Sequence, residues 1–356
     1  MNTLSAGWVR LMNLAFLVAS VFFVESAGAA RYYEEWNLAS LQKKYAKAMA
    51  IPTPWIGYWW PYREGGINNG LNDADGLSAA AKLDRVFGKR NWVSGWEYNR
   101  HGKGRRSPDW WGHCNGWAVA AIMEAEPRSD IDVKGVRFGV RDRKAILSEY
   151  WMESGSDFIG NRVWSAKDTS SRAFWDVVPA QFHLAMTNIV GRQGRSVIID
   201  RYTGYEIWNQ PVVAYEIKPI REDDYLGRDP RYRNLYRVNV ETTLWWANDE
   251  VDPDEITPEF QWEEDDFFSK RTLRYELWVD APLEFDSSGN LASSGNIVLT
   301  NQGTGGRWKN GSTYNELVNS HPDYIWIPLS YARSSGFKNP RINDAWVRAN
   351  IAAEAN

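Results

Sequence analysis

The chain has 356 residues, of which 44% are hydrophobic and 14% aromatic, and its formal net charge is −4 at pH 7. This composition excludes an intrinsically disordered protein and is sufficient for a sizeable hydrophobic core. Because the net charge is slightly negative and no basic stripe is evident, we do not expect nucleic acid to be a partner.

The first 29 residues have the pattern of a secretory signal peptide. Arg10 precedes an apolar run from Leu11 to Val24, and the small residues Ala27 and Ala29 follow it. Cleavage after Ala29 predicts an extracellular or periplasmic mature protein that does not associate with a membrane. An uncleaved membrane anchor is the alternative, but the run is shorter than the roughly 20 apolar residues that span a bilayer.

The rest of the chain, residues 30–356, is predicted to form a single α+β domain. We expect a helical half up to about residue 176 and a strand-rich half from about residue 177. Apolar residues at helical spacing predict helices over 34–50 and 77–90, with Ser78 as N-cap of the second, and a helical insert over 143–153.

The single cysteine, Cys114, lies in the segment DWWGHCNGWAVAA. Its small and apolar residues predict a helix that begins near Cys114 and ends before Pro127. Secreted proteins usually carry cysteines in pairs, so an unpaired thiol is either buried and inert or kept for its reactivity. At a helix N-terminus the helix dipole favours a thiolate, and free backbone N–H groups can hold an oxyanion. We therefore predict Cys114 as a nucleophile, with an indole of Trp110 or Trp111 as a second oxyanion donor.

Strand patterns dominate from about residue 177 onward. The predicted strands, each flanked by Gly, Pro, Asn or Asp, are FHLAMTNIVG, SVIID, EIWNQPVVAYEIK, YRVNVETTLWWAN, LRYELWVDA, GNIVLT and DYIWIPL. Helices followed by strands indicate an α+β fold with a central nucleophile-bearing helix packed on an antiparallel sheet.

A nucleophilic thiol also needs a base, and four histidines are available. His101 lies in a polar loop, His321 precedes a proline at a turn, and His113 is expected to point away from its neighbour Cys114. The fourth histidine, His183, lies at the start of the segment FHLAMTNIVG. This segment is followed by the turn RQGR and by SVIID.

If these segments form a hairpin, residue 183 lies opposite roughly residues 200–202. This register predicts His183 as the base and Asp200 as the acid that orients its ring. Two alternatives stay open. In the first, His183 is a core histidine and Asp200 a turn former. In the second, the segment is a helix that begins at Pro179, which would weaken the hairpin argument.

Two acidic stretches, residues 247–266 and 72–76, contain enough carboxylates to bind calcium. Their spacing does not match the ligand positions of an EF-hand loop. Solvated surface is therefore the favoured interpretation of both stretches, and the sequence identifies no metal ligands.

The stretch EIWNQPVVAYEIK, residues 206–218, closely resembles the surface peptide of the transglutaminase elicitor family, which plants sense. The segments PWIGYWWPYREGGIN, LSAAAKLDRVFG, WWGHCNGWAVAA, PAQFHLAMTNIVGRQGRSVIID and HPDYIWIPLSYA resemble the same family in the same order. The resemblance covers the chain from about Pro54 to Pro340. Because Cys114 is the only cysteine, any disulfides of the family are absent here, and this absence points to a bacterial-type member.

This resemblance implies a papain-like thiol acyltransferase, a protein-glutamine γ-glutamyltransferase that is often calcium-dependent. Its partners would be proteins with accessible glutamine and lysine side chains. Cys114, in GHCNGWA, matches the nucleophile, and Trp208 joins Trp110 and Trp111 as a candidate for substrate contacts. Two other functions stay open: a papain-like cysteine protease or glutamine deamidase, and a non-enzymatic protein that binds a surface or cell wall, with Cys114 buried.

Overall fold

The computed structural model describes residues 31–70, 75–102, 104, 106–160, 176–201, 206–299, 305–309, 321–332 and 337–352. The predicted signal peptide lies outside these residues, as does most of the acidic stretch 72–76. A search of the described ranges finds no helix with the length and apolarity that crossing a membrane requires.

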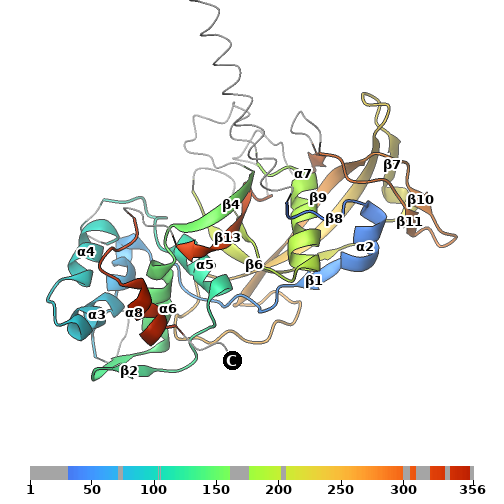
Figure 1. Ribbon diagram of the computed structural model, residues 1–356. Helices are drawn as coiled ribbons and strands as arrows, with labels where there is room; N and C mark the ends of the chain where they lie inside the picture. The colour runs from blue at the N-terminus through green and yellow to red at the C-terminus, as the bar shows by residue number, and fades with distance from the viewer. Residues whose placement is uncertain are drawn as a thin grey trace, which may run out of the picture.

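An antiparallel sheet, with nine strands in the described ranges, forms the centre of the molecule (Figure 1). The strands run in the order β12–β9–β8–β6–β5–β13–β4, while β1 also pairs with β6 and β7 with β8. The strand bounds are β1 Lys47–Met49, β4 Ser154–Gly160, β5 Ile198–Asp200, β6 Asn209–Ile217, β7 Tyr225–Arg228, β8 Tyr236–Ala247, β9 Phe268–Val279, β12 Arg307–Trp308 and β13 Tyr324–Ala332. Two separate ribbons are formed by β2 (Ile131–Val133) with β3 (Val136–Phe138), and by β10 (Glu284–Phe285) with β11 (Leu291–Ser293).

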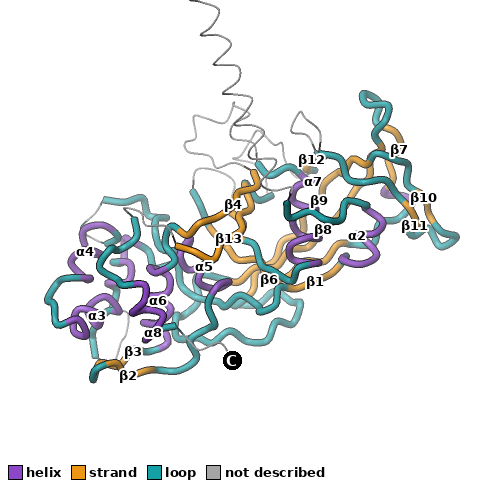
Figure 2. Tube along the Cα trace, viewed as in Figure 1, coloured by secondary structure: helices purple, strands orange, loops and turns teal. Residues whose placement is uncertain are grey.

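The helices lie in two groups at opposite ends of this sheet (Figure 2). One group comprises α3 (Ala79–Phe87), α4 (Val93–Arg100), α6 (Val140–Tyr150) and α8 (Asp344–Asn350), with α5 (Cys114–Met123) between it and the sheet. The other comprises α2 (Leu38–Tyr45), α7 (Pro179–Ala185) and the π-helical segment η4 (Met186–Arg192). Short 3-10 turns occupy Tyr62–Glu64, Gly66–Asn68 and Glu222–Asp224. The α+β prediction is confirmed, including the cysteine-bearing helix packed on an antiparallel sheet.

Alternating strand residues divide the hydrophobic core into two clusters, one on each face of the sheet. Ile198 and Val213 pack with Trp117 of α5, whereas their neighbours Ile199 and Val212 pack with Phe182 of α7. Because successive side chains of a strand point to opposite faces, α5 and α7 cover opposite faces of the sheet. This separation decides which of the predicted site residues can meet.

Helix α5 begins at Cys114, as the sequence predicts, and it lies unusually close to α6. A Cβ atom at Gly116 would come within 2.0 Å of the carbonyl oxygen of Ser148. Glycine is therefore required here for the close approach of the two helices. Helix α3 is also confirmed, and the Ser78 hydroxyl accepts from the N–H of Ala81 at 3.2 Å, as expected of an N-cap.

Two of the expected strands are not formed. The segment FHLAMTNIVG is the continuous helical run α7–η4 instead of a strand, because Pro179 occupies the first helical turn, where its missing N–H costs nothing. The side chains of Thr187 and Asn188 bond back to the carbonyl groups of His183 and Leu184, which is typical of a helix interior. In GNIVLT only isolated bridges form, at Asn296 and Ile297.

The helix predicted over 34–50 is shorter than expected. The Asn37 side chain caps α2 by accepting from the N–H of Ser40, and the helix ends at Tyr45. The following residues leave the helix because they form β1, an edge strand whose Met49 pairs with Ala214 of β6. The helical insert expected over 143–153 is confirmed as α6, which starts three residues earlier, at Val140.

Candidate active site

Cys114 is the first residue of α5, and its thiol faces the start of β6. The Sγ atom donates to the carbonyl oxygen of Ile207 at 3.8 Å and accepts from Nδ2 of Asn209 at 3.6 Å. Because the preceding residue, His113, makes no side-chain cap bond, the backbone N–H groups of the first helical turn are not used by a capping side chain. These groups can hold an oxyanion next to the sulfur.

Asn209 is held in place by side chains of β13, the strand on the far side of β5. Its Oδ1 atom accepts from Nε1 of Trp326 at 3.1 Å and from the hydroxyl of Tyr324 at 3.3 Å. An amide whose oxygen is fixed by two donors must turn its NH₂ group the other way, which here is toward the sulfur. Asn209 is therefore a site residue that the sequence reasoning missed, although it lies within the WNQPV signature.

Two buried carboxylates flank this asparagine. Asp200, the last residue of β5, pairs with Asn209 across the sheet and accepts from the backbone N–H of Trp208 at 2.9 Å. On the other side, Val212 of β6 pairs with Trp246 of β8, and continuing this register by three residues brings Asp249 opposite Asn209. Opposite residues of adjacent strands share a face, so Asp200 lies on the face that α5 covers. Asp249 follows the end of β8, and its charge acts on Cys114.

The electrostatic effect of these carboxylates reaches the thiol. Burial raises the pKa of Cys114 to about 11; the charges of Asp249 and Asp200 add to the rise, and the bond from Asn209 opposes it. Burial also raises the pKa of Asp249 to about 6, with the charge of Arg201 lowering it and that of Glu250 raising it. Burial and negative charge thus favour the protonated form of the thiol, and burial favours the protonated form of Asp249.

His183 lies on the opposite face of the sheet from Cys114. Its ring is 1% exposed, and Nδ1 lies 2.9 Å from the hydroxyl of Tyr275, a residue of β9. Burial lowers the pKa of His183 to about 3. The predicted hairpin is wrong, because the position opposite Asp200 is held by Asn209 while His183 belongs to helix α7.

No described hydrogen bond joins the thiol to any of the four imidazoles, all of which are in the described ranges. Nε2 of His321 lies 2.6 Å from Oδ2 of Asp176, and its ring stacks on Trp308. His113 does point away from Cys114, as expected. The catalytic role of His183 therefore stays a prediction that no contact in the described structure supports.

The predicted tryptophans lie around the loops that precede α5 and β6. Trp110 and Trp111 contact each other edge to face, with ring centroids 6.0 Å apart. Trp208 packs against Trp59 at 5.1 Å, and the carbonyl of Trp59 accepts from the N–H of His113, next to the nucleophile. Trp208 thus lies close to the thiol, while the oxyanion role of Trp110 and Trp111 stays a prediction.

A second group of polar side chains includes His113, the residue before Cys114, and the sequence reasoning did not predict it. Four fully buried side chains, here called the His–Glu cluster, bring one ligand atom each to within 4.8 Å of one another; they are Glu97, His101, His113 and Glu149. In the absence of an ion, burial is outweighed by opposite charge, so the pKa of His101 is raised and that of Glu149 lowered. The one signal in the sequence was the Glu97–His101 spacing, which puts both residues on one helix face.

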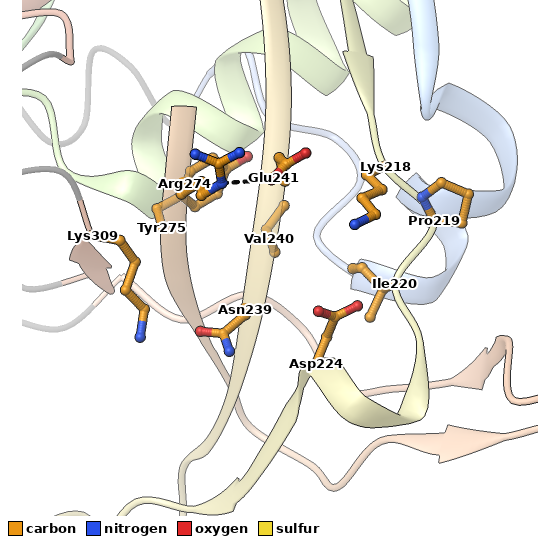
Figure 3. A pocket seen from close by; sticks show the side chains of 10 residues that line it. All are labelled: Lys218, Pro219, Ile220, Asp224, Asn239, Val240, Glu241, Arg274, Tyr275 and Lys309. Atoms are coloured by element: carbon orange, nitrogen blue, oxygen red, sulfur yellow. Dashed lines mark hydrogen bonds and ion pairs between the residues drawn. The ribbon is translucent and has the colours of Figure 1, made fainter. Parts of the chain in front are cut away.

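A cavity beside the sheet lies among residues other than those around Cys114 (Figure 3). It measures about 360 Å³ and is bordered by charged side chains of β8 and β9, where Nε of Arg274 donates to Glu241 at 2.6 Å. Lys218 and Lys309 lie at its edges. Because none of its lining residues is a cysteine or a histidine, this cavity is not the predicted nucleophilic site.

Residues 97–235 match a family model described as transglutaminase elicitor. This part of the chain is thus similar to the transglutaminase elicitor family. The matched segment contains both Cys114 and the WNQPV peptide. The fold is similar to that of the GP42 transglutaminase from Phytophthora sojae, with a TM-score of 0.64, 22% identity and coverage of 91% of this chain and 96% of that one. No curated protein matches the chain.

The stretch that resembles the family's elicitor peptide is for the most part a buried strand and not a surface segment. Residues 209–217 form β6, which pairs with β5 and β8, and Glu216 is its one exposed side chain. The Val213 and Tyr215 side chains are fully buried. The surface location implied by the family resemblance therefore does not hold here, because this peptide is a central strand of the sheet.

Calcium, which the family resemblance implies, does not fit the residues that converge in the described structure. Calcium takes six to eight oxygen ligands, whereas the His–Glu cluster, the one converging group found among the described residues, offers two imidazole nitrogens. In the acidic stretch 247–266, Asp252 and Asp254 are paired with Arg141. Calcium dependence stays a prediction, and no step below depends on it.

Proposed function

We propose that this transglutaminase-like protein is an exported acyltransferase that joins glutamine and lysine side chains of proteins through a thioester on Cys114. The observation that carries the proposal is the bond from Asn209, in the family's peptide signature, to the sulfur at the N-terminus of α5. Export rests on the pattern of the first 29 residues.

In the proposed reaction, Sγ of Cys114 attacks the carboxamide carbon of a glutamine side chain. The C–N bond breaks, the thioester forms, and the amide nitrogen leaves as ammonia with the proton taken from the thiol. N–H groups of the first turn of α5 and Nδ2 of Asn209 donate to the oxyanion; such a donor is typically worth about 3–4 kcal/mol. A lysine amine then attacks, the C–S bond breaks, and the isopeptide forms while the proton returns to sulfur.

The proton acceptor that we propose is Asp249 in place of His183. The sheet separates His183 from the thiol, whereas the charge of Asp249 acts on Cys114. A pKa raised to about 6 by burial makes Asp249 a base that is largely ionised at neutral pH yet stronger than an ordinary aspartate. Asp200 accepts from the backbone N–H of Trp208, so in this proposal it positions the start of β6 in place of the ring-orienting role predicted for it.

Asp249→Asn is expected to lower the rate of amine incorporation by about 100-fold or more, because a general base contributes about 10²–10⁴-fold. The wild-type rate should rise with pH through about 6, as Asp249 loses its proton, and the variant should lose this inflection. The matched control is His183→Gln, which keeps a polar partner for Tyr275 and should retain most activity. Loss of activity in His183→Gln with retention in Asp249→Asn would restore the histidine as the base.

The function is tested by incubating the purified protein with casein and a labelled primary amine. Covalent label on casein is the expected result. Peptide fragments would instead indicate a protease, and ammonia release without label would indicate a deamidase. Each of these outcomes would overturn the transfer step while leaving the nucleophile in place.

A second candidate function, non-enzymatic binding, is favoured by one observation: the Cys114 side chain is only 6% exposed. A buried, protonated thiol reacts slowly with alkylating reagents. Iodoacetamide labelling of the native protein separates the two functions. Rapid modification at near-neutral pH supports the enzyme, whereas modification only after unfolding, together with no reaction on casein, supports the binding protein.

A further inference from the structure

We propose that the His–Glu cluster is a closed binding site for one divalent transition-metal ion, with Zn²⁺ as the best fit. This site is separate from the thiol chemistry proposed above. It rests on the positions of the four side chains and their outer hydrogen bonds, so it stands even if the protein is not an acyltransferase.

The ligand atoms are spaced as the corners of a coordination sphere. Nε2 of His113 lies 2.9 Å from Oε2 of Glu149 and 3.9 Å from Oε2 of Glu97, while Nδ1 of His101 lies 3.2 Å and 3.4 Å from the same two oxygens. Metal–ligand bonds of about 2.0–2.2 Å place the corners of a tetrahedron about 3.3–3.6 Å apart. The four distances bracket that value.

The outer atoms of three ligands are already bound elsewhere, which leaves their inner atoms for an ion. Oε1 of Glu97 accepts from Nδ2 of Asn339 at 2.6 Å, and Oε1 of Glu149 accepts from the backbone N–H of the same asparagine. Nδ1 of His113 lies 3.2 Å from the carbonyl oxygen of Trp60. A carbonyl only accepts, so Nδ1 carries a hydrogen; in the neutral ring that a metal requires, Nε2 then has the lone pair that faces the cluster.

One inner atom makes no hydrogen bond of normal geometry. Oε2 of Glu97 is fully buried, and the two imidazole nitrogens that face it lie 3.4 and 3.9 Å away. A buried carboxylate oxygen without a good hydrogen bond is costly, and an ion at the centre of the cluster removes that cost. One dication also balances the two carboxylates when both imidazoles are neutral.

The ligand set selects the class of metal. Two imidazole nitrogens and two carboxylate oxygens suit Zn²⁺ and its first-row neighbours, whereas calcium and magnesium prefer oxygen alone. Because the side chains are 0–1% exposed, they leave no open position for water, which is typical of structural sites. The ion would join α4, α6 and the residue before α5, and so hold the N-terminus of α5 that carries Cys114.

The proposal is tested on the full chain, purified without chelator or added metal. Elemental analysis by mass spectrometry is expected to find about one transition-metal ion per chain. Stripping with a chelator should lower Tm by on the order of 10 °C, and Zn²⁺ but not Ca²⁺ should restore it. Co²⁺ taken up by the stripped protein should give the visible bands of a tetrahedral site.

Variants separate binding at this cluster from binding elsewhere. Glu97→Gln and His101→Gln should lose most of the bound metal. Asn339→Ala leaves all four ligands in place and removes the outer hydrogen bond to Glu97, together with side-chain bonds to Val93 and Arg341. It should lower the metal affinity about 10–100-fold. His183→Gln, another buried histidine, is the matched control and should keep full occupancy. If a ligand variant does not fold, the Co²⁺ spectrum of the wild-type chain and the metal affinity of Asn339→Ala test whether the cluster binds the ion. A wild-type chain that neither contains nor takes up a transition metal, or ligand variants that keep it, would overturn the proposal.

Discussion

Cys114→Ala is expected to abolish amine incorporation completely, since it removes the atom that forms the thioester. The effect should exceed that of any other single substitution in the site, because without the sulfur no covalent intermediate can form. The measurement is incorporation of a labelled amine into casein, together with trapping of the acyl-enzyme by mass spectrometry. The variant should keep the fold, because the hydrogen bonds described for the thiol, to Ile207 and Asn209, are long and weak.

Cys114→Ser is the matched control for this substitution. It keeps the size and both contacts but supplies a poorer nucleophile, so a small residual activity and an unchanged Tm are expected. If Cys114→Ala retained the wild-type rate, the label on casein would have to arise at another residue. The proposed function would then fail, whereas the metal site behind α5 would be unaffected.

Gly116→Ala is expected to destabilise the protein by about 3 kcal/mol or more. The new methyl group would lie 2.0 Å from the carbonyl oxygen of Ser148, and this neighbour is backbone of a buried helix that cannot rotate away. The shift between α5 and α6 would also disturb Cys114 and Glu149, so activity and metal content should fall together. Chemical denaturation with a circular dichroism readout measures the change.

Gly95→Ala in α4 is the control for that experiment. Its Cβ would meet the Cβ of Asn91 at 3.4 Å, an ordinary contact, and alanine is the better helix former. This substitution should leave the free energy of unfolding unchanged or raise it by about 0.5–1 kcal/mol. Equal effects of the two substitutions would show that α5 and α6 adjust to the methyl group and that their close packing is not required.

Local sequence patterns predicted an element correctly where the segment itself contains capping, breaking or periodic residues. The start of α5 at Cys114 and its end before Pro127 follow from small residues, glycine and proline in the immediate sequence. Ser78 caps α3 because its hydroxyl reaches an N–H three residues away. Alternating and apolar runs likewise identified β8, β9 and β13, since two-residue periodicity and β-branched or aromatic side chains are properties of short stretches.

Local patterns failed where a segment is apolar all round. FHLAMTNIVG is buried on every side, and a short apolar run of this kind does not distinguish a strand from a buried helix. The choice was made by packing, because the segment fills the space between β9 and α2. Taking it as a strand put His183 opposite Asp200, a position that Asn209 occupies in the folded chain.

The amino-acid sequence alone determined the class of this protein, the helix that bears its single thiol and the family signature that links that thiol to β6. Only the tertiary structure decided which polar groups meet. The sheet puts α5 and α7 on opposite faces and so parts Cys114 from His183. The packing of α4, α5 and α6 gathers the cluster behind the thiol from positions as far apart as Glu97 and Glu149. Contacts of this range depend on how whole elements pack, and no periodicity within one segment encodes them.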